Sequence, residues 1–439
     1  MNLPSIRPRA INHSLESAMN RFYRPLLFLF LVLLAAGQGL AAPSAQDDPD
    51  RDANVVSSNP LTEKLLNSGP VTYPRETYDG LETLRSGHAD QAYAMWVEQG
   101  LNGNIQALAL AAMLCLAEER EPSVGWQVQF GKDAPPPSPV CPVPAAFWEK
   151  HLVDMLGEAE AAFLLGLYGM ELMDYDPHRK MDTYARPVET YMLRSARAGH
   201  PSGMYGAFRT GENRTGPFIP PASLPDVPVL PEKFNPRINY EGRYWISQAA
   251  HAGHTFSMAA LALDYEGGDD VNYRQDVTPK VAPDTNKMEQ YYTMAVAHGS
   301  LGAAASLAVL YAEGHILPQN CPRSLYYSAI RVRLEEGGKI ILDDREHYPL
   351  GNALRIKKEG FMEGNLTLGG KRVAWKPCLT EAEFDDAVAR SKTAYEAAMA
   401  VRAKEKAAHD ALYDKAREKL PRVKAAYEEA VRKGQTGIK

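Results

Sequence analysis

The sequence lacks the short motifs that mark common catalytic and cofactor sites. It contains no GxSxG, no HExxH, no paired CxxC and no glycine-rich phosphate loop. Its formal net charge of -6 comes without any block of Lys and Arg, and binding to nucleic-acid phosphates needs such a cluster. Nucleic-acid binding is therefore excluded from the expected functions, and an enzyme of the hydrolase type ranks behind non-catalytic functions.

Apolar runs of membrane length are also scarce, and the one candidate lies near the N-terminus. Two arginines precede an apolar stretch from Leu26 to Ala36, and Gly39 and Ala41 then supply the small residues that a signal peptidase recognises. We expect residues 1–41 to be a signal peptide, and hence a periplasmic protein with no stable membrane span. An uncleaved anchor is the alternative, but the stretch is shorter than the roughly 20 residues that a span needs.

The beginning of the exported chain carries two further expectations. Either Met1 or Met19 is the start of translation, because the residues before Met19 show no hydrophobic pattern. After the signal, Asp47 to Asn59 is polar and acidic, with no apolar periodicity. Such a composition buries too little apolar surface to fold, so we expect residues 42–75 to form a flexible leader.

Only four cysteines are present, and export to an oxidising compartment favours disulfides between them. Proximity in the sequence favours pairing of Cys115 with Cys141 and of Cys321 with Cys378. Four unpaired thiols are the alternative, and the spacing of the four residues does not suit a zinc site.

The sequence repeats itself with glycine at fixed positions. The two clearest copies are centred on Gly253 and Gly299, and small, large and glycine positions follow each of them at offsets of four, eight, twelve and fifteen residues. An aromatic residue lies eight positions before each of these glycines, and an alanine lies four before. The residues that define the repeats are Tyr191, Gly199, Trp245, Ala249, Gly253, Leu261, Tyr265, Gly268, Tyr291, Ala295, Gly299, Ala303, Leu307, Tyr311 and Gly314. Because spacing by four places residues on one helix face, each copy predicts two close-packed helices joined at a glycine.

These residues resemble the Sel1-like repeat family, whose tetratricopeptide-like helix pairs carry an aromatic residue, alanines, a Gly-His doublet and a final Tyr and Gly. The doublet is matched by Gly199-His200 and Gly253-His254. The resemblance is strong over 240–268 and 285–336, and partial over 89–116 and 154–211. It implies an all-α fold, an α-solenoid of stacked helix pairs over residues 76–336.

Insertions interrupt the resemblance and predict irregular loops. The three insertions cover residues 135–144, 215–236 and 269–284 and include proline-rich stretches. The proline-rich segment 218–236 is interpreted as a stiff loop packed on the scaffold, with a polyproline ligand as the alternative. Residues 337–378 are expected to form an irregular excursion with a small β element near 339–376.

Residues 379–439 predict a C-terminal helical segment, because they are rich in Ala, Glu, Lys and Arg. Thr380 and Glu383 form the pattern of a capping box that opens a helix, and Pro421 predicts a division into two helices. The segment is interpreted as a helix that caps the end of the repeats. A partner-binding or coiled-coil helix is the alternative.

Isolated polar residues in the sequence do not form the patterns of a metal or catalytic site. His251 and His254 lie three apart, but no third ligand is nearby in sequence, so no metal site is expected. The other candidates, interpreted as solvated or structural, are His298, His315, Glu158, Glu160, Asp343 and Asp344. We expect no catalytic residue, cofactor or metal. The many tyrosines suit protein recognition on a concave surface, although half of them are expected in the core.

The sequence therefore favours a non-enzymatic function for an exported helical-repeat protein. The first hypothesis is a scaffold or adaptor of the bacterial envelope that binds another protein. The second is an immunity protein that binds and blocks a periplasm-acting toxin, such as a secreted phospholipase effector. A hydrolase is the third. The residues that bind the partner, an envelope component or a toxin, are not identified by the sequence.

Overall fold

The structure is a computed structural model of residues 1–439. It describes residues 54–57, 59, 62, 64–66, 71–120, 140–210, 236–266, 284–338, 365–368, 371–374 and 379–436. The chain divides into two units, residues 1–54 and 55–439, and the description below concerns the second. The expected signal peptide, Gly268, Cys378 and most of the three insertions lie outside the described residues.

The described residues are predominantly helical, and the predicted all-α architecture of stacked helix pairs is confirmed. A short helix α2 (Arg75–Arg85) precedes the pairs. These are α3 (Ala89–Leu101) with α4 (Ile105–Arg120), α6 (Ala145–Leu156) with α7 (Glu158–Tyr175), α8 (Met181–Arg197) with α9 (Pro201–Thr210), α10 (Pro236–His251) with α11 (Thr255–Glu266), and α12 (Thr285–Ala297) with α13 (Leu301–Glu313). Helix α14 (Cys321–Glu335) follows as a single first helix. Two further helices, α15 (Glu381–Arg417) and α16 (Leu420–Thr436), complete the described chain.

A glycine in the left-handed region ends the first helix of every pair. The five are Gly103, Gly157, Gly199, Gly253 and Gly299, with φ between 81° and 124°. Only glycine adopts this conformation without steric cost, and it lets the chain reverse at once into the second helix. The five turns define one surface, the turn edge, which is central to the site described below.

Apolar side chains form two main clusters in the described chain. The first joins α3, α4, α6, α7 and α8, and the second joins α10 to α14. The second helices α4 and α7 are buried on nearly all sides, because their alanines allow neighbouring helices to approach closely. Eleven of the repeat-defining residues are buried: Tyr191, Trp245, Ala249, Leu261, Tyr265, Tyr291, Ala295, Gly299, Ala303, Leu307 and Tyr311. Their role is to hold neighbouring pairs together.

The strands are few and short. Strands β1 (Asn54–Val56) and β2 (Thr72–Pro74) lie near the beginning of the described chain. Strands β3 (Asn365–Leu368) and β4 (Lys371–Ala374) form an antiparallel hairpin in which Leu366 lies opposite Val373. This hairpin falls within the region where a small β element was expected.

The segment expected to be a flexible leader, residues 42–75, differs from that expectation in its described part. Leu65 is fully buried, and so is Thr62. The hydroxyls of Ser57 and Thr62 donate hydrogen bonds of 2.8 and 2.6 Å to Glu171, a carboxylate buried in α7. Composition alone predicts disorder here because it cannot reveal a buried acceptor more than 100 residues away.

Candidate protein-interaction surface

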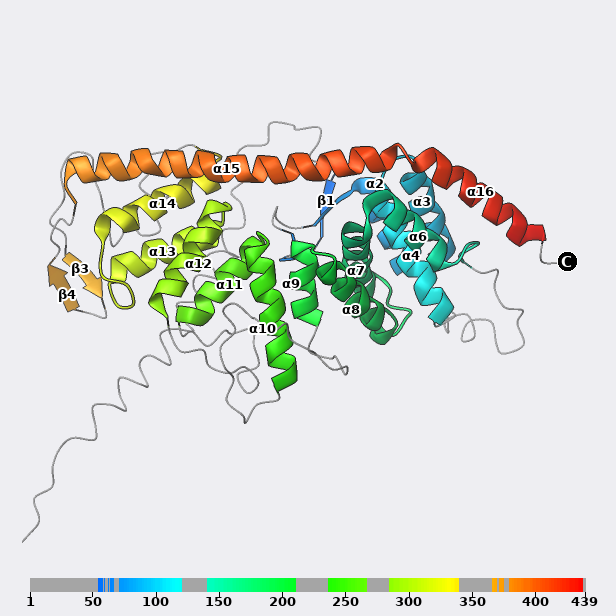
Figure 1. Cartoon of the computed structure of the whole chain (residues 1–439), viewed down its shortest axis with the longest axis horizontal. Helices are drawn as coiled ribbons and strands as arrows, with labels where there is room; N and C mark the ends of the chain where they lie inside the picture. Colours follow the sequence, from blue (N-terminus) through cyan, green and yellow to red (C-terminus); the bar gives the residue numbers. More distant parts are fainter. Residues whose placement is uncertain are drawn as a thin grey trace, which may run out of the picture. The chain divides into compact units, whose positions relative to one another are not determined.

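Helices α15 and α16, together called the strap, lie along the turn edge. Helix α15 contacts α14, α12, α6 and α4, and α16 contacts α3. Figure 1 shows α15 as one continuous helix beside the pairs. The strap thus meets the repeats in the reverse of their order in the sequence, and it links both apolar clusters.

The first part of α15 packs on α14 through small side chains. Ser391 and Ala398 are buried. The Arg333 guanidinium on α14 donates to the Ser391 hydroxyl, with an Nε–Oγ distance of 3.1 Å, and the Tyr395 ring lies against Gly338. Residue numbers therefore increase in the same direction along both helices, so α14 and α15 are parallel. The prediction of a helix that caps the end of the repeats applies to this part of α15 only, because α15 continues well beyond α14.

Beyond α14, the strap bonds backbone carbonyls at the turn edge. The Arg402 guanidinium donates to the carbonyl oxygens of His298 and Gly299 at 3.2 and 2.6 Å. These carbonyls follow α12 at its C-terminal end, where the helix dipole is negative and acceptors lack intrahelical partners. An arginine is well suited to this position. The Glu405 carboxylate lies 3.4 Å from the His298 Nδ1 atom.

The middle of the strap, residues 403–411, is exposed at every position. These nine residues make about two and a half helical turns without a buried side chain, and Glu405 contacts His298 from the first of these turns. The span reads AKEKAAHDA and is held by its own side chains, including the pair Lys406–Asp410. It is a solvent-bridging helix between two packed ends.

The second part of the strap packs through larger side chains. Tyr413, Leu420 and Val423 are buried, as is Ala416 between them. With the half-buried Tyr427, these positions are separated alternately by three and four residues, which places them on one face across the α15–α16 junction. This spacing is the signal in the sequence that could have located the surface.

The receiving surface, here called the dock, is formed by Tyr93 of α3 and by Phe147 and Trp148 of α6. The Tyr427 ring centroid lies 5.1 Å from that of Trp148 and 6.3 Å from that of Phe147. The indole N–H of Trp148 donates to the Tyr93 hydroxyl at 3.2 Å. Because the Trp148 N–H already has an acceptor, this apolar surface can bury an aromatic side chain without leaving a donor unpaired.

Two cations of the strap bond carbonyls beside the dock. The Arg417 Nε donates to the Gly103 carbonyl at 3.3 Å, and the Lys419 ammonium donates to the carbonyls of Asp154 and Met155 at 2.5 and 3.4 Å. These acceptors lie where α3 and α6 end. The chemistry at Arg402 is therefore repeated at two more first helices of the array.

A largely buried network joins the strap to the second and third pairs. The Tyr413 hydroxyl donates to one oxygen of Glu160 at 2.8 Å, and the His200 Nε2 lies 3.0 Å from the other. The His200 ring stacks on Phe163. Burial by itself raises the pKa of Glu160, but its hydrogen bonds with His200 and Tyr413 outweigh that effect and lower the pKa. Glu160 is thus held as a carboxylate.

The second Gly-His doublet has another role. His254 is fully buried; its Nδ1 lies 2.8 Å from the Ser257 hydroxyl, and its Nε2 lies 3.1 Å from the Leu65 carbonyl. Burial lowers the pKa of His254 to about 4, so the ring is neutral at pH 7 and donates one N–H. His251 instead lies near Tyr291. Within the described ranges, no three His, Cys, Asp or Glu side chains gather as a metal site.

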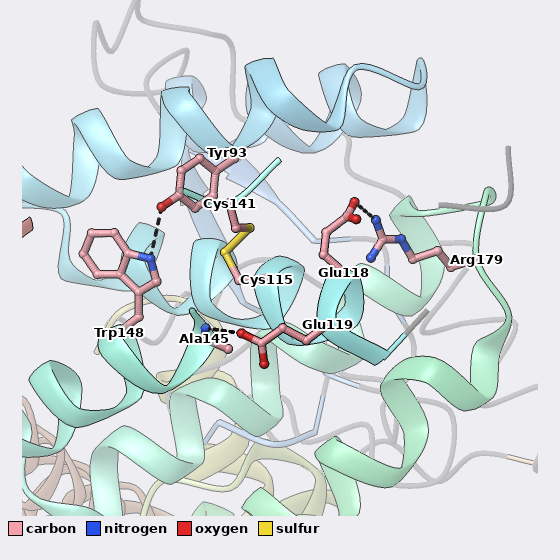
Figure 2. Close-up of a disulfide and its surroundings, with 8 residues drawn as sticks. All are labelled: Tyr93, Cys115, Glu118, Glu119, Cys141, Ala145, Trp148 and Arg179. Atoms are coloured by element: carbon pink, nitrogen blue, oxygen red, sulfur yellow. Dashed lines mark hydrogen bonds and ion pairs between the residues drawn. A yellow bond between two sulfur atoms is a disulfide. The ribbon is translucent and has the colours of Figure 1, made fainter. Parts of the chain in front are cut away.

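A disulfide joins Cys115 of α4 to Cys141, close before α6, with Cα atoms 5.6 Å apart. Figure 2 shows it beside the Tyr93–Trp148 hydrogen bond, and the Glu119 carboxylate accepts from the Ala145 backbone N–H at the start of α6. The disulfide therefore holds α6, with Phe147 and Trp148 of the dock, against α4. Cys321 is also disulfide-bonded, while its expected partner Cys378 lies outside the described residues.

The remaining sequence candidates are separate from one another. Glu158 pairs with Arg194, whereas Glu160 belongs to the buried network, so the two adjacent carboxylates do not act together. His315 is exposed, and Asp343 and Asp344 lie outside the described residues. Among the tyrosines whose side chains the structure describes, each is buried or half-buried, so the expected exposed tyrosine surface is not found in that part of the chain. The packing of helix pairs uses their rings instead.

No family model matches the chain, and no curated protein matches it. Among the described residues, no helix combines the length and apolar character that a bilayer crossing requires. Among solved structures, the chain is similar to the crystal structure of a Sel1 repeat protein from Oxalobacter formigenes, with 18% sequence identity and a TM-score of 0.30. The likeness covers 61% of this chain and 84% of that one.

Proposed function

We propose that the chain is an exported scaffold of Sel1-like repeats that binds another protein in the bacterial envelope. The observation that carries this proposal is that the turn edge already holds a helix, the strap, through backbone carbonyls and an apolar dock. Carbonyl acceptors are independent of side-chain identity, so the same surface can hold other helices with the same spacing. Export is proposed from the sequence pattern of residues 1–41.

The use of the buried polar groups supports binding over catalysis. Glu160 is bonded to Tyr413 and His200, and Glu171 to the hydroxyls of Ser57 and Thr62. A general acid or base must reach a substrate, and these carboxylates are enclosed by groups of their own fold. We therefore propose a non-enzymatic function.

Affinity capture of the mature chain from envelope extract, followed by mass spectrometry, tests the proposal. We expect one co-purifying protein, which is then produced separately and must bind the purified chain with defined stoichiometry in calorimetry. The control is the same chain unfolded in urea on the matrix. Recovery of no protein that binds again after purification would contradict the proposal.

The immunity hypothesis makes a narrower prediction in the same experiment. If the recovered partner is a lipase-like toxin, its activity on phospholipid vesicles should fall to background at one equivalent of the chain. A partner without hydrolytic activity, or a toxin that stays active in the complex, supports the general scaffold instead.

A further inference from the structure

We propose that the dock is a binding site for an amphipathic α-helix of a partner protein, and that residues 412–436 of the strap occupy it in cis. This inference rests on the proposed function and identifies its binding surface. The dock is the surface defined above by Tyr93, Phe147 and Trp148, with the carbonyls of Gly103, Asp154 and Met155 at its rim.

The dock recognises the spacing of a few large side chains on a helix. Three large side chains, Tyr413, Leu420 and Val423, are buried from the strap side, and Tyr427 packs on Trp148. Helix-in-groove recognition uses anchors with this spacing. Any helix that presents the same pattern, with a basic residue near its centre, meets the same floor and the same carbonyls.

The second end of the strap can leave the repeats while the first end stays bound. The exposed span 403–411 buries no side chain, and its contact with His298 through Glu405 lies at the end next to Arg402. A helix segment that buries nothing opens locally at little cost in free energy. Residues 412–436 can therefore leave the dock while residues 381–402 stay on α14.

The docked segment has one open edge beside α4. A groove of about 600 Å³ runs between the start of α4 and the strap, lined by Gly103, Gln106, Asp410 and Tyr413 among others. An incoming helix can reach the rim carbonyls from this side before the strap has fully left. A basic residue near the centre of the incoming helix takes the place of Arg417 and Lys419 at these carbonyls.

A labelled synthetic peptide of residues 412–436 serves as the probe, and fluorescence anisotropy reads its binding. The wild-type mature chain holds its own copy at an effective concentration of order millimolar, so it should resist the peptide. A full-length variant with Val423→Asp and Tyr427→Asp vacates the dock without altering it, and should bind the peptide at least tenfold more tightly. A peptide carrying the same two substitutions is the control and should bind neither chain.

A second preparation covers the case in which that variant does not fold. A protease site placed in the exposed span 403–411 is cut after the intact chain has folded, which leaves residues 412–436 held without a covalent link. We expect the labelled peptide to replace the cut fragment, as measured by size-exclusion chromatography. Failure of the peptide to bind the variant and to exchange with the fragment would overturn the inference.

The same peptide separates this inference from the proposed function. If the captured partner is displaced by the wild-type peptide and not by the substituted one, the dock is its binding site. If a partner binds but the peptide does not displace it, the proposed function stands and the inference fails. Dimerisation of the chain through exchanged straps, measured by light scattering, would also overturn the assignment to a different protein.

Discussion

Tyr413 and Glu160 are 253 positions apart in the sequence, and the phenol of one donates a 2.8 Å hydrogen bond to the carboxylate of the other. Glu160 begins the second helix of its pair, and Tyr413 lies near the end of α15. This single bond therefore fixes the strap against the repeats at a point where Tyr413 is buried and the Glu160 side chain is 12% exposed. His200 holds the remaining carboxylate oxygen.

Replacement of Tyr413 by phenylalanine should destabilise the fold by about 2 kcal/mol, because a hydrogen bond to a charged, buried acceptor is lost while the ring is kept. Urea unfolding of the purified chain measures the change. Tyr326→Phe is the matched control, since its hydroxyl lies outside the Glu160 network, and it should change the midpoint little. Equal midpoints for the two variants would contradict the role of the bond.

Acid should weaken the fold through His254. Its pKa in the folded chain is lowered by burial from 6.5 to about 4, so the folded state binds fewer protons than the unfolded state between these values. The stabilising contribution is complete above pH 6.5 and falls as pH decreases toward 4, by about 3 kcal/mol in total. Unfolding free energies measured from pH 7.5 to 4 should show this loss.

His254→Gln is the comparison for that series, because glutamine still offers a donor to the Leu65 carbonyl and does not titrate. The variant should lose less stability than the wild type over the same pH range. If the two curves stay parallel, His254 does not titrate as proposed.

Two glycines close together in the sequence should respond to alanine in opposite directions. Gly299 has φ of 81°, and a Cβ there would lie 2.5 Å from the Arg402 Nε, so Gly299→Ala strains the backbone and displaces the Arg402 guanidinium from its carbonyls. We expect a loss of about 2 kcal/mol. Gly302→Ala, in α13 with no atom near the added methyl, should gain up to about 1 kcal/mol from helix propensity. Thermal unfolding decides, and a stabilising Gly299→Ala would contradict the strap contact.

Removal of the Cys115–Cys141 bond should destabilise the chain by about 3 kcal/mol, the chain-entropy value for a loop with a separation of 26 residues. The double variant Cys115→Ala, Cys141→Ala is preferred to a reducing agent, which would also break the bond at Cys321. Urea unfolding gives the stability. Loss of peptide binding to the dock in this variant, with the fold intact, would add evidence that the bond fixes α6.

Local patterns predicted the parts of the fold that depend on near neighbours in sequence. The capping box at Thr380 and Glu383 forms as predicted, because its donors and acceptors lie three residues apart. The division near Pro421 is also confirmed: α15 ends at Arg417 and α16 begins at Leu420. Glycine at each turn follows from the backbone conformation that only this residue adopts freely.

The path of the strap could not be predicted in the same way. Arg402 bonds the carbonyls of His298 and Gly299, and Arg417 bonds that of Gly103. Every residue has a backbone carbonyl, so such acceptors leave no pattern in the sequence. The burial of Thr62 was missed for a related reason: its acceptor, Glu171, lies on a distant helix.

The parallel direction of α14 and α15 sets a requirement on the chain that joins them. Helix α14 has 15 residues, so the connection must return over about 22 Å before α15 can begin. About seven extended residues reach that far, whereas the joining chain runs from 336 to 380. Most of this connection is in excess of what topology demands, so it can be shortened, lengthened or given an epitope tag while the helices on either side keep their alignment.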